Sequence, residues 1–174
     1  PELMRILLDE EGLSWENAWD ITKKSISYTN HTIMQEAMEK WPVDMVRELL
    51  PRIYQIIEAI NQRHLDRKIS LYGEELTYRT TIISEGYVKM AHLAIIGSHS
   101  VNGVAQLHTD ILKEETLHDF YKMYPSKFNN KTNGITQRRW LHLANEKLTQ
   151  LIDDKIDQEW KVNPAELRQF KAYS

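Results

Sequence analysis

Apolar residues recur with helical spacing over most of the chain. In the clearest stripe, Ile53, Ile56, Ile57 and Ile60 follow one another at i, i+3, i+4 and i+7. The same kind of spacing predicts further helices over residues 3–8, 15–22, 45–50, 104–112, 117–124, 148–156 and 164–170. The hydrophobic pattern therefore predicts a mostly helical protein.

Side chains with known preferences for helix ends set several of these boundaries. The predicted N-caps are Ser14, Asn145 and Asn163. Thr32 and Gln35 have the spacing of a capping box, which predicts a helix directly after Asn30. Pro51 interrupts an apolar stretch, and it either kinks that helix or opens a new one at its first turn.

Two segments depart from the helical pattern. SISYTN, residues 25–30, alternates apolar with polar positions, which predicts a short strand. VKMAHLAIIG, residues 88–97, is almost continuously apolar, and we interpret it as a strand buried on both faces of a parallel sheet. His92 falls within it and is expected to be a core histidine whose polar atoms are hydrogen-bonded. Residues 63–81 are polar and mixed, and we expect them to form an exposed connection.

Each predicted strand leads through a polar turn into a helix. This order is typical of α/β proteins, so we predict a mostly helical α/β chain with about two short parallel strands. Two strands do not complete a doubly wound sheet. The sequence begins with Pro1 and not with methionine, and we expect it to be an excised piece of a longer protein.

Composition narrows the class of protein. The 174 residues carry 22 Lys and Arg against 25 Asp and Glu, a formal net charge of -3, which argues against a nucleic-acid-binding module. Cysteine is absent, so the chain contains neither a disulfide nor a thiolate metal site. No apolar run approaches the ~20 residues that span a bilayer, and the start does not read as a signal peptide. We therefore expect a cytoplasmic protein without a membrane partner.

Three polar turns carry the candidate chemistry: TNHT at residues 29–32, SHSVNG at 98–103 and KTNGIT at 131–136. In open α/β sheets, ligands bind beyond the carboxyl ends of the strands, where strand meets helix. Amide side chains and main-chain groups there suit a neutral polyol, whose hydroxyls both donate and accept hydrogen bonds. Taken one at a time, each turn is better explained by turn geometry and helix capping.

The stretch KFNNKTNGITQRRW, residues 127–140, allows several interpretations. Asn130 begins a glycosylation sequon, as does Asn30, but the chain shows no feature of a secreted protein. Its basic residues are candidates for an anion site, although no glycine-rich phosphate loop accompanies them, and a solvated or ion-paired basic face explains them better. They are Lys127, Lys131, Arg138 and Arg139. A contribution to a sugar site is the remaining interpretation.

The sequence contains no specific motif for metal binding or for catalysis by a pair of carboxylates. His92, His99 and His108 lack the spacing of metal ligands. Glu36 and Glu39 lie at i and i+3 of the predicted helix and resemble a carboxylate pair. Surface solvation explains that pair equally well.

Several longer phrases occur in one order and at natural spacings. They are YTNHTIMQEAMEKWP, LLPRIYQIIEAINQRHL, MAHLAIIGSHSVNGVAQLHTDIL and FYKMYPSKFNNKTNGITQRRWL. Together they resemble the middle of an α-glucan phosphorylase, of the kind that acts on glycogen, starch or maltodextrin. The resemblance covers almost the whole chain, and the agreement of several phrases in sequence makes it specific.

The resemblance implies a fold and an activity for the whole protein. The fold would have two Rossmann-like lobes of the GT-B type, with residues 1–133 ending the N-terminal lobe and residues 134–174 crossing into the C-terminal lobe. The activity would be phosphorolysis of an α-1,4-glucan, glycogen or maltodextrin, by inorganic phosphate to give glucose 1-phosphate. Pyridoxal phosphate, held by a lysine, would supply its own phosphate as a proton shuttle. The family is cytoplasmic, includes allosteric enzymes and forms homodimers.

The resemblance also implies substrate-binding residues. His31, Val104 and Asn133 match residues that line the bound glucosyl unit. The histidine offers its main-chain carbonyl to the sugar 6-hydroxyl, the asparagine binds through its side chain, and the valine packs against the ring. Thr32 and Glu39 match residues of a side pocket near the anomeric carbon. None of these is implied to be a catalytic acid, base or nucleophile.

The chain departs from the family pattern at several points. Gln137 stands where the family usually has proline, and residues 63–81 are shorter than in animal members. Glu85 and Lys89 match a surface glycogen-storage site of animal enzymes, whose surroundings are shortened here. Neither the glycine-rich cofactor-phosphate loop nor the lysine motif that carries pyridoxal phosphate is found, so we expect these 174 residues alone to be inactive.

A second hypothesis is a standalone oligosaccharide-binding or regulatory module derived from a phosphorylase. Titration with maltoheptaose separates the two hypotheses, because only a module is expected to bind at millimolar concentration or tighter. An isolated piece is also expected to self-associate through strand edges and apolar faces that neighbours would otherwise cover.

Overall fold

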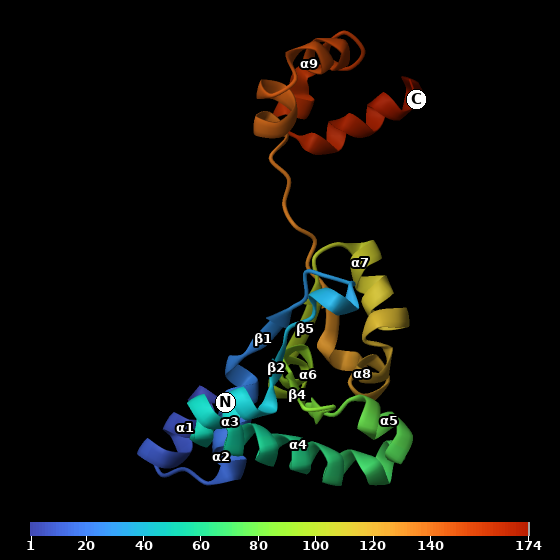
Figure 1. Cartoon of the computed structure of the whole chain (residues 1–174). Coiled ribbons are helices and arrows are strands. Elements are labelled where there is room, and N and C mark those ends of the chain that lie inside the picture. Colours follow the sequence, from blue (N-terminus) through green and yellow to red (C-terminus); the bar gives the residue numbers. More distant parts are fainter. Residues whose placement is uncertain (174) are drawn as a thin grey trace. The chain divides into compact units, whose positions relative to one another are not determined.

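The computed structural model describes residues 1–173 and divides the chain into two compact units, Pro1–Thr132 and Asn133–Ser174 (Figure 1). Each unit has an apolar core of its own. The larger core brings together buried side chains from most elements of the first unit. The smaller core of the second unit is built around Ile152, Ile156 and Trp160.

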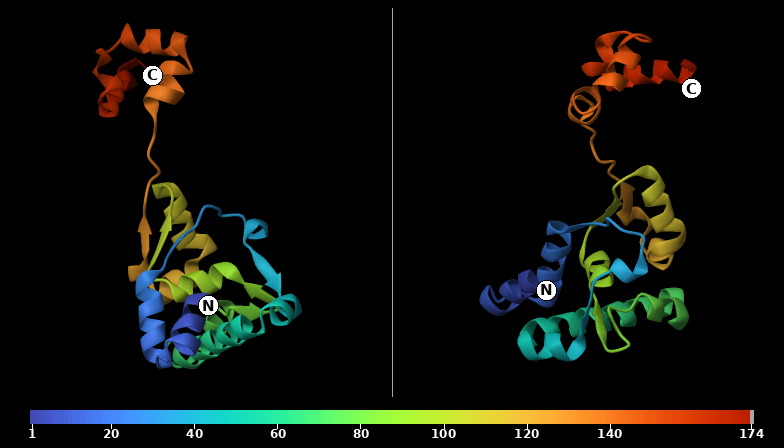
Figure 2. Two further views of the ribbon diagram at one scale, coloured as in Figure 1. Left: turned by 90° about the vertical axis from the view of Figure 1, so that its left-hand side faces the viewer. Right: turned by 45° about the horizontal axis from the view of Figure 1, so that its top comes forward.

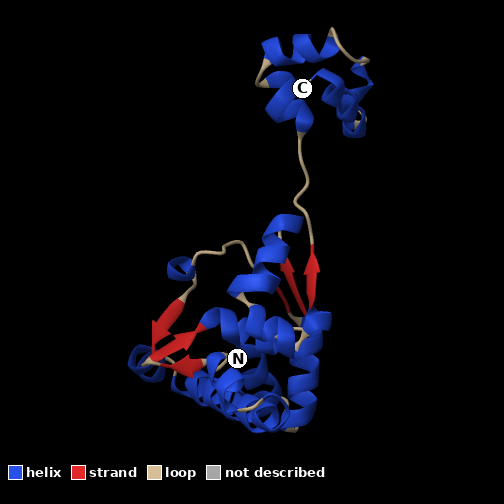
Figure 3. Ribbon diagram, turned by 90° about the vertical axis from the view of Figure 1, so that its right-hand side faces the viewer, coloured by secondary structure: helices blue, strands red, loops and turns tan. Residues whose placement is uncertain are grey.

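A three-stranded parallel sheet lies in the first unit, in the order β1-β5-β6. Its strands are β1 (Ser27–Thr29), β5 (Ser100–Gly103) and β6 (Phe128–Asn130). Thr29 lies opposite Asn102, and Gly103 lies opposite Asn130, so all three strands end at nearly the same level. Their arrows point the same way in Figure 3.

A second, antiparallel sheet has the order β2-β4-β3. Its strands are β2 (Lys40–Pro42), β3 (Ile83–Ser84) and β4 (Tyr87–Lys89). Glu85 and Gly86 form the turn between β3 and β4, with φ of 55° and 80°. Both values are positive, as a tight two-residue hairpin turn requires. The segment between β1 and β2 is an open loop with one short turn (Figure 2).

Helices make up most of the first unit. Its α-helices are α1 (Glu2–Arg5), α2 (Trp15–Ser25), α3 (Val43–Leu49), α4 (Pro51–Tyr72), α5 (Glu74–Arg79), α6 (Met90–Gly97), α7 (Gln106–Ile111) and α8 (His118–Met123). Shorter π-helical and 3-10 turns are η1 (Ile6–Glu10), η2 (Gln35–Ala37), η3 (Leu112–Thr116) and η4 (Pro125–Lys127). None of the helices among residues 1–173 combines the length and apolarity needed to cross a membrane.

Several predicted helix boundaries are confirmed. The Ser14 hydroxyl accepts a hydrogen bond from the Asn17 amide and caps α2. Pro51 occupies the first turn of α4, so it opens a new helix and does not kink the previous one. Ile56, Ile57 and Ile60 of the predicted stripe are buried on one face of α4.

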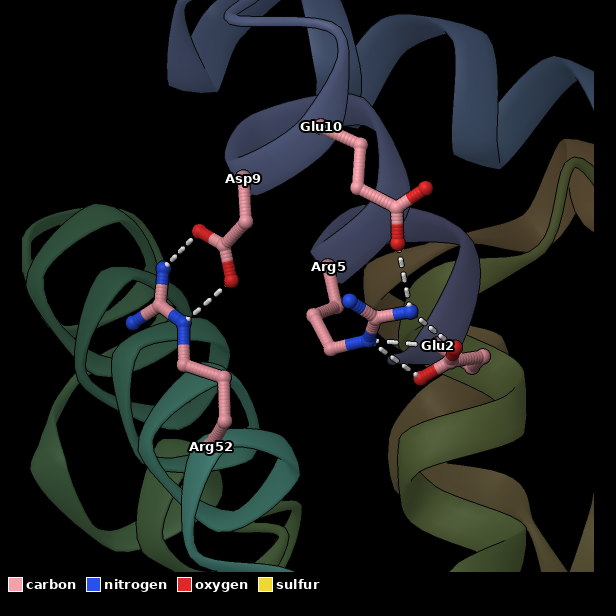
Figure 4. Close-up of polar contacts among 5 residues, drawn as sticks. All are labelled: Glu2, Arg5, Asp9, Glu10 and Arg52. Carbon is pink, nitrogen blue, oxygen red and sulfur yellow. Dashed lines mark hydrogen bonds and ion pairs between the residues drawn. The ribbon is translucent and has the colours of Figure 1, made fainter.

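Ion pairs connect the N-terminal turns to α4 (Figure 4). Arg52 donates to both carboxylate oxygens of Asp9, at 2.7 Å and 2.5 Å. The pKa of Asp9 is lowered, chiefly by these hydrogen bonds. Arg5 pairs with Glu2 and Glu10, and these pairs connect the N-terminal turns to each other and not to α4. These pairs are exposed, so they fix geometry more than they add free energy.

The second unit is helical throughout its regular part. Its elements are η5 (Arg138–Leu143), α9 (Glu146–Asp153), η6 (Gln158–Lys161) and η7 (Pro164–Tyr173). The Asn145 side chain caps α9 through the Leu148 amide, as predicted. Trp160 is fully buried, and its indole N–H donates to Asp153 Oδ1 at 2.9 Å. The helix predicted after Asn163 is a 3-10 helix.

The predicted strand over residues 88–97 is wrong. Only Val88 and Lys89 belong to a strand, and the remainder is the buried helix α6. A continuous apolar run fits a helix buried on all sides as well as a buried strand, so periodicity could not separate them. The parallel sheet has three strands where about two were predicted, and only β1 matches a predicted one. β5 and β6 were missed because each is short and has a single large apolar residue.

Two further predictions are corrected. Residues 63–81 are not an exposed connection, since α4 continues to Tyr72 and α5 follows. No capping box starts a helix at Thr32, because its hydroxyl accepts from the Met34 amide and closes a local turn. Glu36 and Glu39 therefore do not lie on one helix face. Gln35 begins only a single 3-10 turn.

Candidate functional site

The carboxyl ends of β1, β5 and β6 lie at one edge of the parallel sheet. The residues that follow these strands are Asn30, Val104 and Lys131. The Asn30 amide donates to Asn102 O at 2.9 Å, and the Lys131 amide donates to Gly103 O at 3.1 Å. The sheet pairing therefore extends into the turns themselves. We call this region the carboxyl edge.

Asn30 is the centre of the hydrogen bonds at this edge, and only 2% of its surface is exposed. Its Oδ1 accepts from the Thr32 amide at 2.9 Å, which shapes the turn that contains His31. Its Nδ2 donates to the Tyr28 hydroxyl at 3.1 Å. A buried amide with both of its polar atoms bonded holds its turn in one conformation.

His108 connects the first turn to the second. The Val104 amide donates to His108 Nδ1 at 3.1 Å, so the proton of the neutral ring lies on Nε2. Nε2 lies 3.2 Å from Asn30 Oδ1 and donates to it. One imidazole thus holds the backbone of Val104 and the side chain of Asn30 at the same time.

The third strand end is connected through Thr109 and Gly103. The Thr109 hydroxyl lies 3.0 Å from Asn130 Oδ1, and Asn130 Nδ2 donates to Thr132 Oγ1 at 2.8 Å. A Cβ added at Gly103 would lie 2.5 Å from Thr109 Oγ1 and 3.1 Å from His108 Nδ1. Only glycine fits there, because the start of α7 approaches the backbone of β5 so closely.

The structure brings some of the predicted site residues together. His31 and Thr32 lie in the turn that Asn30 shapes, and Val104 is held through His108. His31 is exposed, whereas Thr32 and Val104 are half-buried. Asn133 is exposed and is the first residue of the second unit.

Glu39 has different neighbours. Its carboxylate accepts from the Trp41 indole at 2.9 Å, and its main-chain oxygen accepts from the Met90 amide at 3.1 Å. Both contacts belong to the region of the second sheet. Among residues 1–173, no hydrogen bond connects the Glu39 side chain to the network around Asn30.

Sequence reasoning missed the role of His108. It appeared as one position of a helical stripe and as an unsupported metal ligand. The usable signal was its position four residues after Val104, directly beyond a strand. From the first turn of a helix, a polar ring at that position can hydrogen-bond to the main chain at the end of the preceding strand. Asn30 and Asn102 were recognised as polar turn residues, but their mutual bonding was not.

The remaining histidines are not arranged as metal ligands. Within residues 1–173, no group of three His, Asp or Glu side chains is placed to hold a metal ion. His92 lies on α6, and its Nδ1 bonds to Thr81 O at 2.8 Å, so the prediction of a satisfied core histidine is confirmed. Burial lowers its pKa to about 4.

Lys127 does not fit the role of an attachment lysine for pyridoxal phosphate. The cofactor needs a lysine amine free to form a Schiff base. Burial, with repulsion from Lys23 and Lys68, lowers the pKa of Lys127 to about 8. However, its ammonium group donates to Ile95 O at 2.8 Å and to Ile96 O at 3.3 Å. Lys127 also precedes β6 and so lies away from the carboxyl edge.

Comparison with known proteins identifies the family. A family model described as carbohydrate phosphorylase matches residues 1–174. The chain belongs to the carbohydrate phosphorylase family. The predicted resemblance is therefore confirmed.

Curated relatives of this carbohydrate phosphorylase chain include glycogen phosphorylases. Glycogen phosphorylase of Bacillus subtilis (strain 168) is 52% identical over 176 residues, which cover 100% of this chain and 22% of that protein. The brain form of Homo sapiens is 51% identical over 98% of this chain and 21% of its own length. The muscle form of Bos taurus is 49% identical over 99% of this chain and 21% of its own length. The chain thus spans about a fifth of the length of these relatives.

Proposed function

We propose that the chain is the central segment of an α-1,4-glucan phosphorylase, which releases glucose 1-phosphate from glycogen or maltodextrin. In this proposal the carboxyl edge provides one side of the glucosyl site. The observation that carries it is the convergence of the His31 turn and Val104 on one network through Asn30 and His108. The family membership supplies the reaction type.

The chemistry of this edge suits a sugar. The exposed turn around His31 offers main-chain groups, and the half-buried Val104 offers an apolar surface for the sugar ring. Asn133 is proposed to bind the same ring through its side chain, and Thr32 and Glu39 to line a side pocket. Fixing the glucosyl ring orients its anomeric carbon for attack by phosphate, which is a positioning contribution to catalysis.

We further propose how the whole protein is organised. Residues 1–133 end the N-terminal lobe of a GT-B fold, and residues 134–174 begin the C-terminal lobe. Pyridoxal phosphate binds to residues outside this segment, and the whole protein is a cytoplasmic homodimer. The segment alone is inactive and self-associates through exposed apolar side chains. In the second unit these include Trp140, Leu143 and Val162.

The test is made in the longer protein that contains this segment. Replacing Asn133→Ala is expected to lower kcat/KM for maltoheptaose phosphorolysis by roughly 100-fold, since a buried sugar hydroxyl loses its partner. Asn163→Ala, also in the second unit, is the control and is expected to leave kcat/KM within about twofold. An unchanged kcat/KM in Asn133→Ala would remove this residue from the site.

The segment by itself provides a second test. The 174-residue chain is incubated with maltoheptaose and inorganic phosphate, and glucose 1-phosphate is measured. We expect no product and no binding of maltoheptaose at millimolar concentration. Product formation would contradict the inactivity of the segment, and binding without product would favour a standalone oligosaccharide-binding module.

A further inference from the structure

A pocket of about 490 Å³ lies at the opposite edge of the same sheet. Lys23, Ile96 and Lys127 line it, and each stands a few residues before the start of β1, β5 or β6. We call this region the amino-edge pocket. The rest of its lining comes from the N-terminal part of α2, from α4 and from Tyr124. It is thus separate from the proposed sugar site at the carboxyl edge.

The lining of this pocket is cationic. Its charged residues are Lys23, Arg63, Arg67, Lys68 and Lys127, and no Asp or Glu lines it. Arg63 forms an exposed ion pair with Glu16, at 3.4 Å, and Glu16 does not line the pocket. Within residues 1–173, Lys23, Arg67 and Lys68 take part in no ion pair. Several cations around one cavity without a facing carboxylate form a site for an anion with more than one charge.

Burial and mutual repulsion make the positive charges of this pocket unfavourable in the free protein. Burial lowers the pKa of Lys68, and repulsion from Lys23 and Lys68 adds to the lowering of the Lys127 pKa. Lys127 has its ammonium bound to the Ile95 and Ile96 carbonyls, so it contributes positive potential without being free to move. An anion in the pocket would offset this repulsion.

The pocket also has an apolar and aromatic part. Ile60, Leu71 and Ile96 line it together with the rings of Trp15 and Trp19. The Arg63 guanidinium lies 4.6 Å from the Trp15 ring centroid. The cavity volume is within the range of small-molecule sites. Apolar surface next to grouped cations selects a ligand with a flat apolar ring and a strongly charged group.

We propose that the amino-edge pocket binds a small aromatic phosphate monoester, with its ring on the apolar side chains and its phosphate near Arg67 and Lys68. Two negative charges on the phosphate match the several cations better than a single carboxylate does. Arg67 can bond two phosphate oxygens at once through its planar fork.

The experiment titrates the 174-residue chain with phenyl phosphate and follows tryptophan fluorescence. Phenyl phosphate has no aldehyde, so no lysine adduct can imitate binding. Trp15→Phe and Trp19→Phe show whether the signal comes from the pocket. We expect phenyl phosphate to bind at least about 10-fold more tightly than inorganic phosphate and than benzyl alcohol. Equal affinity for inorganic phosphate, or for benzyl alcohol, would overturn the proposal.

Matched variants separate the pocket from general charge. Lys23→Met and Lys24→Met each remove one lysine from neighbouring positions of α2, but Lys24 faces Asp20 at 2.7 Å and is not in the lining. We expect Lys23→Met to weaken phenyl phosphate binding about fivefold and Lys24→Met less than about twofold. Equal weakening by the two would overturn the proposal.

A further variant distinguishes loss of binding from loss of folding. Lys68→Met keeps most of the apolar stem and removes a charge that has no ion-pair partner among residues 1–173 and lies 4.3 Å from the Tyr124 ring centroid. It is expected to weaken phenyl phosphate binding at least about fivefold while the melting temperature stays the same or rises. Loss of binding together with a lower melting temperature would mean that Lys68 supports the fold and not the ligand, and would overturn its assignment.

Discussion

The two edges of one parallel sheet have opposite chemistry. At the carboxyl edge, neutral amides, a hydroxyl and an imidazole satisfy one another around Asn30. At the amino edge, cations surround a cavity with no carboxylate in its lining. The polar groups of the carboxyl edge hydrogen-bond to one another and so hold the backbone in place. At the amino edge, a bound anion would reduce the repulsion among the cations.

The difference shows what each edge can do without the rest of a larger protein. A network whose bonds are all internal can form in the separate chain, so the turns of the carboxyl edge are already in place. Such preorganisation is what a sugar site requires before the sugar arrives. The amino-edge pocket has its positive potential in place as well, but its charges repel one another until an anion enters.

The largest expected effect is acid destabilisation through two buried histidines. His64 lines the amino-edge pocket, and its Nδ1 accepts from the Tyr124 hydroxyl. Burial lowers the pKa values of His64 and His92 from 6.5 to about 4. Between these values the unfolded chain binds more protons, so stability falls as pH falls from 6.5 to 4, by roughly 2–3 kcal/mol for each histidine.

Urea denaturation across this pH range measures the effect. His64→Leu is expected to be less stable near neutral pH, because the bond to Thr80 Oγ1 is lost, but to show about half of the wild-type decline in acid. A decline equal to that of the wild type would mean that His64 is not responsible. The carboxylates with lowered pKa values, such as Asp9, act only at lower pH.

Replacing one glycine near each edge by alanine compares how closely the two edges are packed. Gly103→Ala is expected to cost about 2 kcal/mol, because the new methyl group would collide with Thr109 and His108. Gly97→Ala, near the amino edge, would meet only Trp19 at 3.6 Å and is expected to be neutral or slightly stabilising. Thermal melts of both variants measure this, and equal melting temperatures would contradict the close packing at the carboxyl edge.

Removing the connecting imidazole is expected to have a smaller effect. His108→Leu leaves the Val104 amide and Asn30 Oδ1 without a partner, which should cost about 1–2 kcal/mol and speed hydrogen exchange at Val104. His99→Leu is the control, since the His99 ring is exposed and its Nδ1 lies 3.2 Å from Lys23 O, outside the network around Asn30. Protection of Val104 that survives in His108→Leu would show that the network does not hold this turn.

The smallest expected effect is a gain in stability, whereas Gly103→Ala and His108→Leu are expected to lose stability. Lys68→Met should stabilise the free chain, because it removes a partly buried charge near His64 and Lys127. After allowance for solvent screening, the gain is at most about 0.5 kcal/mol. Differential scanning calorimetry without added anion measures it. A clear loss of stability would mean that the amino edge is not electrostatically strained.

Local signals in the sequence were sufficient for several elements. The spacing of Ile56, Ile57 and Ile60 predicted the buried face of α4, and Ser14 and Asn145 were recognised as caps. These features depend on neighbours within about one turn of the chain, so the sequence contains them directly. The order of the longer phrases identified the family.

Other elements depended on contacts between distant segments. β6 (Phe128–Asn130) has one apolar residue followed by two asparagines, and this short segment becomes a strand only because β5 lies beside it. The apolar run at Met90–Gly97 is a helix because the surrounding core buries all of its faces. Neither outcome follows from local preference, since tertiary packing overrides a weak or ambiguous pattern.

The sequence by itself therefore determined the family, the helical class and the caps at Ser14 and Asn145, because these depend on residue identity and short spacing. Only the tertiary structure decided that Asn30 and His108, 78 positions apart, would share a hydrogen bond. It also decided that lysines and arginines from separate helices would face one cavity whose lining contains no Asp or Glu. Both edges are products of strand order and helix packing, which bring together groups that are far apart along the chain.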